Sequence, residues 1–182
     1  MNLTKIAVLT ASLSLLTPVL AHEAHVHGVG KLDVAVDGQT LSLHLDSPLV
    51  NLIGFEHKAS SDQDRQSAKD MAKILRNAAN VFVINASAGC TVSSVNLASA
   101  AIEPSLLGEA ATKATAPADH DGHADLDADF LFQCRTPEQL KSIDVKLFEA
   151  FKGFVSIDVQ LVTSKHQAAA KLTPTSSRLL FP

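Results

Sequence analysis

Residues 29–45 alternate apolar and polar positions with a period of two, the pattern of a half-buried β-strand. The apolar positions are Leu32, Val34, Val36, Leu41, Leu43 and Leu45. Asp37-Gly38, between the two runs, is a favourable two-residue hairpin turn. We therefore predict a β-hairpin in which Val34 lies opposite Leu41 on the buried face, and Leu32 opposite Leu43.

The same alternation marks residues 124–134, where every second residue is apolar and three aspartates occupy positions between them. Its apolar positions are Ala124, Leu126, Ala128, Phe130, Phe132 and Cys134. Further strands are expected within residues 81–101, 143–147, 154–163, 168–172 and 178–181, with Val92, Val95 and Leu97 pointing inward. Thr136-Pro137 predicts a short helical turn. Because no long alternation of strand and helix appears, the predicted class is α+β with a mainly antiparallel sheet.

Residues 60–79 form the one long amphipathic helix that the sequence predicts. Apolar residues recur there at spacings of three and four, at Ala68, Met71, Ala72, Leu75, Ala78 and Ala79. Ser60 and Gln63 fit a capping box at its start. Its basic residues, Arg65, Lys69, Lys73 and Arg76, are expected to be solvated.

Residues 1–21 have the features of a cleavable signal peptide. Lys5 precedes an apolar run from Ile6 to Leu16, and Leu20-Ala21 offers a cleavage site. The run is too short to span a bilayer. We expect residues 22–182 to be exported to the periplasm without membrane insertion, as a single α+β zinc-binding domain with a flexible Ala/Asp/His-containing loop at about 103–123.

The cysteine count is even. An exported chain with only Cys90 and Cys134 most simply joins them in a disulfide. The alternative is a pair of thiolate metal ligands.

Composition narrows the classes of partner. The whole chain carries a net charge of −4, and loss of Lys5 with the leader makes it −5, which disfavours nucleic acid and anionic membranes. Trp and Tyr are absent, so aromatic platforms for sugars or bases are poorly supplied. Met71 is the only methionine outside the leader, which disfavours a thioether copper site.

Three of the eight histidines lie within seven residues directly after the leader, at His22, His25 and His27. Imidazole is a common ligand of Zn²⁺, and affinity rises when several rings converge. His25 and His27 lie on one side of an extended chain, about 7 Å apart at the Cα atoms. If the first strand runs back that far, they share its polar face with His44, which lies opposite Lys31 in the expected pairing. We interpret His44 as a solvated strand histidine, too distant for the same ion.

Two further stretches offer ligands. Residues 47–57 read as an apolar loop closed by Gly54 and Phe55, after which Glu56 and His57 form a corner before the helix. Glu56 and His57 are either metal ligands or part of an ordinary polar corner. Residues 119–125 are rich in Asp and His, including His120 and His123, and form either a weak divalent-cation site or a flexible acidic loop. We predict one tight zinc site of His25, His27 and His57, with Glu56 as fourth ligand or supporting partner.

Several segments together resemble the ZrgA-type family of periplasmic zinc-uptake proteins. They are Ala24-His25-Val26-His27-Gly28, the hairpin from Leu32 to Gly38, Ser47-Pro48, the stretch from Asn51 to His57, the His/Asp-rich stretch, Phe130-x-Phe132-x-Cys134 and Val145-x-Leu147-Phe148. The resemblance implies a zinc-binding accessory to high-affinity zinc acquisition, with Zn²⁺ as cargo and a zinc transporter, of the ABC type or another, as partner. Members often carry a long histidine run in the middle loop. This chain has only His120 and His123 there, which argues against a multi-zinc reservoir.

Two other function classes fit the sequence less well than zinc capture. A zinc hydrolase is disfavoured because His22-Glu23-Ala24-His25 is one residue short of H-E-x-x-H, and Gly28 and Gly30 disfavour a helix there. The third class is an envelope structural or interaction domain whose histidines bind metal incidentally. We therefore expect no enzymatic activity.

Overall fold

The computed structural model describes residues 26–110 and 124–182. They form two β-sheets, one long helix and several short helices. The large sheet has six strands in the order β4-β5-β2-β1-β7-β8. Its strands are β1 (Val29–Asp37), β2 (Thr40–Pro48), β4 (Cys90–Ala98), β5 (Asp125–Cys134), β7 (Ser156–Val162) and β8 (Gln167–Leu172). All of its strand pairs are antiparallel except β1 with β7. The predicted α+β class with a mainly antiparallel sheet and one principal helix is confirmed.

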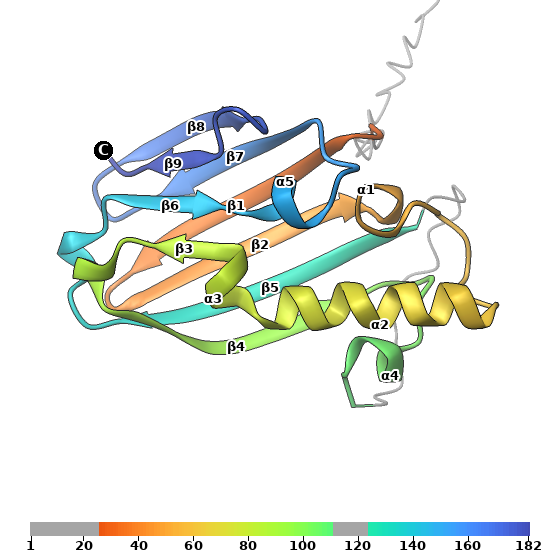
Figure 1. Ribbon diagram of the computed structural model, residues 1–182. Helices are drawn as coiled ribbons and strands as arrows, with labels where there is room; N and C mark the ends of the chain where they lie inside the picture. The colour runs from red at the N-terminus through yellow and green to blue at the C-terminus, as the bar shows by residue number, and fades with distance from the viewer. Residues whose placement is uncertain (1–25, 111–123) are drawn as a thin grey trace, which may run out of the picture.

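A smaller sheet lies over one face of the large one (Figure 1). It comprises β3 (Phe82–Ile84), β6 (Ser142–Val145) and β9 (Arg178–Leu180) in the order β3-β6-β9. Phe82 of β3 packs edge-on against Phe130 of β5, with 4.9 Å between ring centroids, so the two sheets share one core. The last strand, predicted at residues 178–181 as part of one sheet, belongs instead to this second sheet, because β9 pairs with β6.

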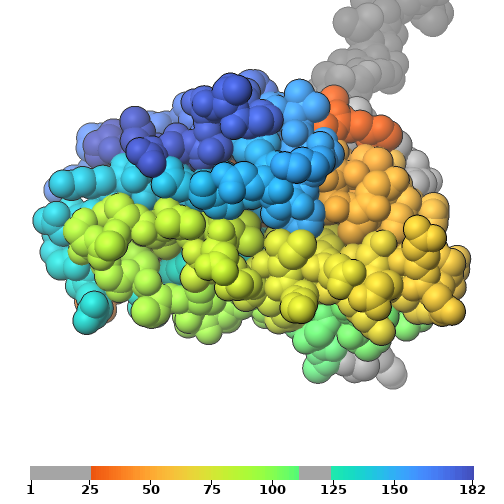
Figure 2. All heavy atoms as spheres, viewed as in Figure 1, coloured from red at the N-terminus to blue at the C-terminus, as the bar shows by residue number. Residues whose placement is uncertain are grey.

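Helices complete the cover on the same face of the large sheet. They are α1 (Leu49–Ile53), α2 (Asp62–Arg76), α3 (Ala78–Val81), α4 (Pro104–Leu107) and α5 (Leu147–Ala150), with single 3-10 turns η1 (Ala86–Ala88) and η2 (Pro137–Gln139). Figure 2 shows the atoms of α2, α3 and the neighbouring strands closing over this side. The opposite face of the large sheet carries no helix or second sheet among the described residues.

The hairpin β1–β2 forms where the alternation predicts it, but its register differs from the expected one. The loop is Gly38-Gln39, so Asp37 pairs with Thr40 and Val34 lies opposite Leu43 rather than Leu41. Gly38 has φ +55°, a value that favours glycine at the first position of a two-residue loop. The shift is two residues, which preserves the face of every side chain because the strand period is two. Leu32, Val34, Leu43 and Leu45 are accordingly buried.

The N-cap of helix α2 lies one residue later than expected. Ser61, not Ser60, accepts a hydrogen bond from the Asp64 amide, and the Asp64 carboxylate accepts one from the Ser61 amide. This reciprocal pair satisfies two amides that the first turn leaves open. Ala68, Met71, Ala72 and Leu75 are buried as predicted. Arg76 departs from the expected solvated face, since its guanidinium donates to the Leu107 and Val95 carbonyls and pairs with Glu109.

Strand β4 is irregular in its middle. Its register with β5 shifts between Val92 and Ser94. Val92 lies opposite the buried Phe132 and so takes the predicted inward face, but on this edge strand it remains exposed. The extra residue of the bulge lets Val95, opposite the buried Phe130, take the same face. Leu97 is buried, as expected. The expected loop at about 103–123 is partly helical, because α4 lies within it and buries Leu107, while residues 111–123 are outside the described part.

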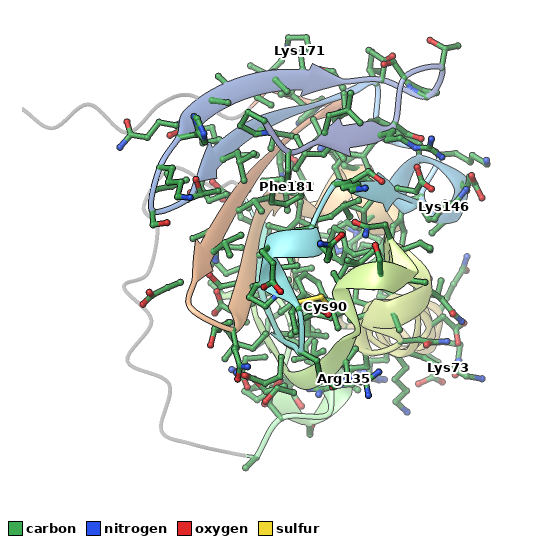
Figure 3. All side chains as sticks on the ribbon, turned by 90° about the vertical axis from the view of Figure 1, so that its left-hand side faces the viewer. Lys73, Cys90, Arg135, Lys146, Lys171 and Phe181 are labelled. Carbon is green, nitrogen blue, oxygen red and sulfur yellow. A yellow bond between two sulfur atoms is a disulfide. The ribbon has the colours of Figure 1, made fainter. Side chains whose placement is uncertain are left out.

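Cys90 and Cys134 lie directly opposite each other on β4 and β5 and form the predicted disulfide (Figure 3). The bond closes a loop over a sequence separation of 44 residues and ties the edge strand β4 to its neighbour.

In the described part of the chain, no helix has the length and apolar character needed to span a membrane.

Candidate metal centre

The start of β1 and the end of α1 are held together by one buried amide, that of Asn51. Its Oδ1 accepts a hydrogen bond from the Gly28 amide at 2.7 Å, and its Nδ2 donates to the Val29 carbonyl at 3.0 Å and to Ser47 Oγ at 3.1 Å. Asn51 is only 2% exposed. Because a buried amide left without partners is costly, this network fixes the approach of the two segments.

Two glycines allow a third segment, residues 153–155, to pack closely against this junction. Gly28 has φ +85°, and a Cβ there would lie 2.9 Å from Val155 Cγ2. A Cβ on Gly153 would lie 2.4 Å from the Asn51 carbonyl oxygen. The backbone therefore packs more closely than any side chain permits. The chain at residues 153–155 thus packs directly against Gly28 and Asn51.

His27 and Glu56 are in contact at this corner. His27 Nε2 lies 3.1 Å from Glu56 Oε2. The His27 side chain is 62% exposed, while that of Glu56 is 17% exposed. The strand does not run back to His27, because β1 starts at Val29 and His27 occupies a turn closed by the Val29 amide and the Val26 carbonyl. His27 therefore faces the end of α1 and not the polar face of the sheet.

His57 is turned in another direction. Its ring stacks on Phe55 with 4.5 Å between centroids and 17° between planes, and its Nδ1 lies 3.1 Å from the Lys58 carbonyl oxygen. A proton on Nδ1 would donate to that oxygen and leave Nε2 with the lone pair that a metal needs. Phe55 packs against the core, as expected for the residue that anchors this loop. The loop itself is short helix α1 over its first part.

The other predicted ligands fall elsewhere. His22 and His25 precede the described residues, and His120 and His123 lie in the gap between 110 and 124. Within residues 26–110 and 124–182, no three His, Cys, Asp or Glu side chains are gathered closely enough to hold a metal ion. Of the predicted tight site, the structure thus brings together His27 and Glu56.

A second histidine has carboxylate partners that the sequence analysis did not assign to it. His44 on β2 lies opposite Asp129 on β5 and opposite Asp33, not Lys31, on β1. Its Nδ1 is 2.8 Å from Asp129 Oδ1, and its Nε2 is 3.8 Å from Asp127 Oδ1. The expectation of a simply solvated histidine is incomplete, although the ring is 41% exposed.

The surroundings of His44 and Asp127 shift the pKa values of both groups. For His44, burial alone would lower the pKa, but the hydrogen bond and charge of Asp129, with the charges of Asp127 and Asp33, raise it above its ordinary value. Burial raises the pKa of Asp127, and the nearby charge of Asp46 raises it further against a smaller opposing effect of His44. The open sheet face is therefore a place where negative charges crowd one another.

Asn51 is the residue at the corner that the sequence analysis named only as part of a motif. A signal for its role was present, because it is the one polar residue in the run Leu49-Val50-Asn51-Leu52-Ile53. A polar side chain within an apolar run that enters the core needs internal hydrogen-bond partners. The partners themselves, Gly28 and Val29, are not evident from the pattern.

Comparison with known proteins adds one finding. A protein-family model described as "ZrgA family zinc uptake protein" matches residues 24–181. No curated protein matches the chain.

Proposed function

Because this chain belongs to the ZrgA family of zinc uptake proteins, we propose that it captures Zn²⁺ in the periplasm and delivers the ion to an uptake transporter. The match extends over almost the whole chain beyond the leader, so the role in zinc uptake applies to the fold as a unit. Zinc is the cargo in this function and takes no part in a reaction. The proposed capture site is the corner that holds His25, His27, Glu56 and His57.

The contact between His27 and Glu56 is the observation that supports this site. A tetrahedral zinc ion with bonds of about 2.0–2.2 Å holds two ligand atoms about 3.4 Å apart. The 3.1 Å between His27 Nε2 and Glu56 Oε2 differs from that separation by a few tenths of an ångström. A small rotation of the exposed His27 ring would admit an ion between them. His25, two residues earlier, and His57, next to Glu56, would supply the remaining ligands.

Exposure at this corner suits a cargo site. Structural zinc sites are enclosed by four protein ligands, whereas an ion that must be handed on needs an accessible side. His27 is largely exposed and lies in a short turn, while the Glu56 side chain is only 17% exposed and follows Phe55, which packs against the core. An exposed ligand, His27, beside a largely buried one, Glu56, permits release of zinc to a partner by ligand exchange.

The test is zinc titration of the double variant His25→Ala with His27→Ala. We expect submicromolar, stoichiometric binding by the native chain and a dissociation constant raised by orders of magnitude in the variant. The matched control is His166→Ala, which removes an exposed histidine on the β7–β8 turn and should leave the constant unchanged. Unchanged zinc affinity in a folded double variant would refute the proposed site.

Zinc titration of the native chain, with an assay for hydrolysis, also tests the two other function classes. Millimolar, non-stoichiometric binding by the native chain would favour an envelope structural or interaction domain. Zinc-dependent cleavage of an ester or peptide would favour a hydrolase. The family is one of zinc uptake and not an enzyme family, which supports a protein without catalytic activity.

A further inference from the structure

The uncovered face of the large sheet carries two adjoining rows of polar side chains, and the strand register fixes both. Across β4, β5, β2, β1 and β7, the first row consists of Asn96, Asp129, His44, Asp33 and Gln160. Across β5, β2, β1, β7 and β8, the second row consists of Asp127, Asp46, Lys31, Asp158 and Lys171. A shallow hollow of about 380 Å³ adjoins the first row beside His44. The face is therefore accessible to a small ion.

The orientation of His44 is set by Asp129. An Nδ1 proton donated to Asp129 Oδ1 at 2.8 Å leaves the lone pair on Nε2. A carboxylate that holds the distal N–H in this way fixes the ring and raises the basicity of the ligating nitrogen in many zinc sites. Nε2 then lies 3.8 Å from Asp127 Oδ1. That distance is too long for a hydrogen bond but close to the ligand–ligand separation of about 3.4 Å around tetrahedral zinc.

Asp127 also faces a like charge. It lies directly opposite Asp46 on β2, and like charges at such positions destabilise a sheet. Lys31 flanks Asp46 on its other side, and Lys171 pairs with Asp158 farther along the row. The charges that act on Asp127 are those of Asp46, Asp125, Asp129 and His44, and His44 Nε2 lies 3.8 Å from Asp127 Oδ1. The end of the row at β5 therefore has an excess of negative charge that a divalent cation would offset.

We propose that this face binds a second zinc ion through His44 Nε2 and the carboxylates of Asp127 and Asp46. Asp129 is a positioning residue that acts through the His44 ring. The site does not depend on the corner of His27 and Glu56, which lies beyond the end of β2. It adds a second ion to the cargo that the proposed function assigns.

The chemistry favours zinc over harder cations. One imidazole with two carboxylates is a ligand set that zinc accepts, with water in the fourth position, whereas Ca²⁺ and Mg²⁺ prefer oxygen alone. Residues directly opposite on an antiparallel pair have Cβ atoms about 5 Å apart, so the carboxylates of Asp46 and Asp127 can meet at one ion. In the structure these three side chains are not gathered closely enough to hold an ion. Rotation of the two aspartate side chains is the change that binding requires.

The test uses the variant His25→Ala with His27→Ala, so that the corner is removed whether or not it binds zinc. Zinc is titrated into this protein while the side-chain nitrogen resonances of His44 are followed by NMR. We expect zinc to shift the Nε2 resonance of His44, and Asp127→Asn to raise the dissociation constant of that shift at least tenfold. His44→Gln should remove one bound zinc per chain.

Two matched controls keep the result specific. Asp158→Asn removes a carboxylate from the same row that is already paired with Lys171, and His166→Gln removes an exposed histidine outside the rows. Both should leave the His44 shift and its zinc dependence unchanged. An Nε2 resonance that zinc does not move, or equal affinity in the folded Asp127→Asn protein, would overturn the proposal. Failure of the corner site would appear separately, as unchanged zinc affinity on replacing His25 and His27.

Discussion

The Asn51 side-chain oxygen accepts a hydrogen bond from the backbone amide of Gly28 at 2.7 Å, across 23 residues of sequence. The same side chain donates to the carbonyl of the next residue, Val29. This pairing closes the end of α1 onto the start of β1. It therefore controls the distance between His27, which precedes Gly28, and Glu56, which follows α1.

Asn51→Leu should destabilise the fold and weaken zinc binding together. The replacement has similar volume but leaves the Gly28 amide and the Val29 carbonyl without their partner, at a cost of about 3 kcal/mol. Urea denaturation measures the loss of stability, and zinc titration measures the looser corner. Asn80→Ala, an exposed asparagine at α3, is the control and should change neither. Full zinc affinity in the Asn51 variant would show that the hydrogen bonds of Asn51 do not position the ligands.

Gly153→Ala should destabilise the same junction from the other side. The added Cβ would lie 2.4 Å from the Asn51 carbonyl oxygen, so the backbone must separate, at a cost of about 1–3 kcal/mol. Gly54→Ala is the comparison, because its Cβ would meet nothing within 4 Å and only its φ of +83° opposes the change. Chemical denaturation of both variants separates steric overlap from backbone strain. A native unfolding midpoint for Gly153→Ala would contradict the close approach.

Loss of the disulfide should lower stability substantially. Replacing Cys90 and Cys134 by alanine opens a loop with a sequence separation of 44, which the chain-entropy model values at about 4 kcal/mol. Guanidinium denaturation of the variant, and of the native protein with and without reductant, measures the effect. Intact mass without reductant should be two hydrogens below the value for free thiols. A native protein that reductant does not destabilise would contradict the expectation.

The cap of α2 should make stability depend on acid. The pKa of Asp64 lies below its ordinary value because its carboxylate accepts a hydrogen bond from the Ser61 amide, with a further contribution from the Ser61 side chain. A depressed pKa means that the ionised form stabilises the fold above the unfolded pKa, near 4, and that this is lost as pH falls through the folded pKa. Thermal unfolding of the native protein and of Asp64→Asn should therefore differ at pH 6 and converge toward pH 2. A constant difference over that range would disprove the assignment.

Deletion of residues 119–123 should separate a weak site from the tight one. Ordering small, polar residues around an ion costs roughly 1–2 kcal/mol per residue, so His120 and His123 are expected to bind zinc weakly. Zinc titration should show a lower total stoichiometry with the tightest dissociation constant nearly unchanged. Loss of the tightest constant on deletion would reverse the ranking of the two sites.

Local patterns were enough to predict several features of this protein. The alternation in residues 124–134 predicted which side chains of β5 are buried, because a strand presents successive residues to opposite faces. The spacing at three and four predicted α2 and its buried stripe. The even cysteine count, in a chain expected to be exported, predicted the bond between Cys90 and Cys134. Each depends on the residues of one segment or on the count of one residue type.

The tertiary structure decided what local patterns leave open, namely which segments become neighbours. Periodicity fixes the face of a side chain but not the partner across the strand, so Asp129 as the neighbour of His44 follows only from the pairing of β2 with β5, 85 residues apart. The parallel pairing of β1 with β7 likewise joins segments far apart in the sequence, as Val29 with Ser156. Long-range contacts also form the corner, since His27 meets Glu56 where Asn51 joins α1 to the start of β1. Residue types indicated zinc chemistry from the sequence, whereas long-range backbone contacts determined which ligands lie together.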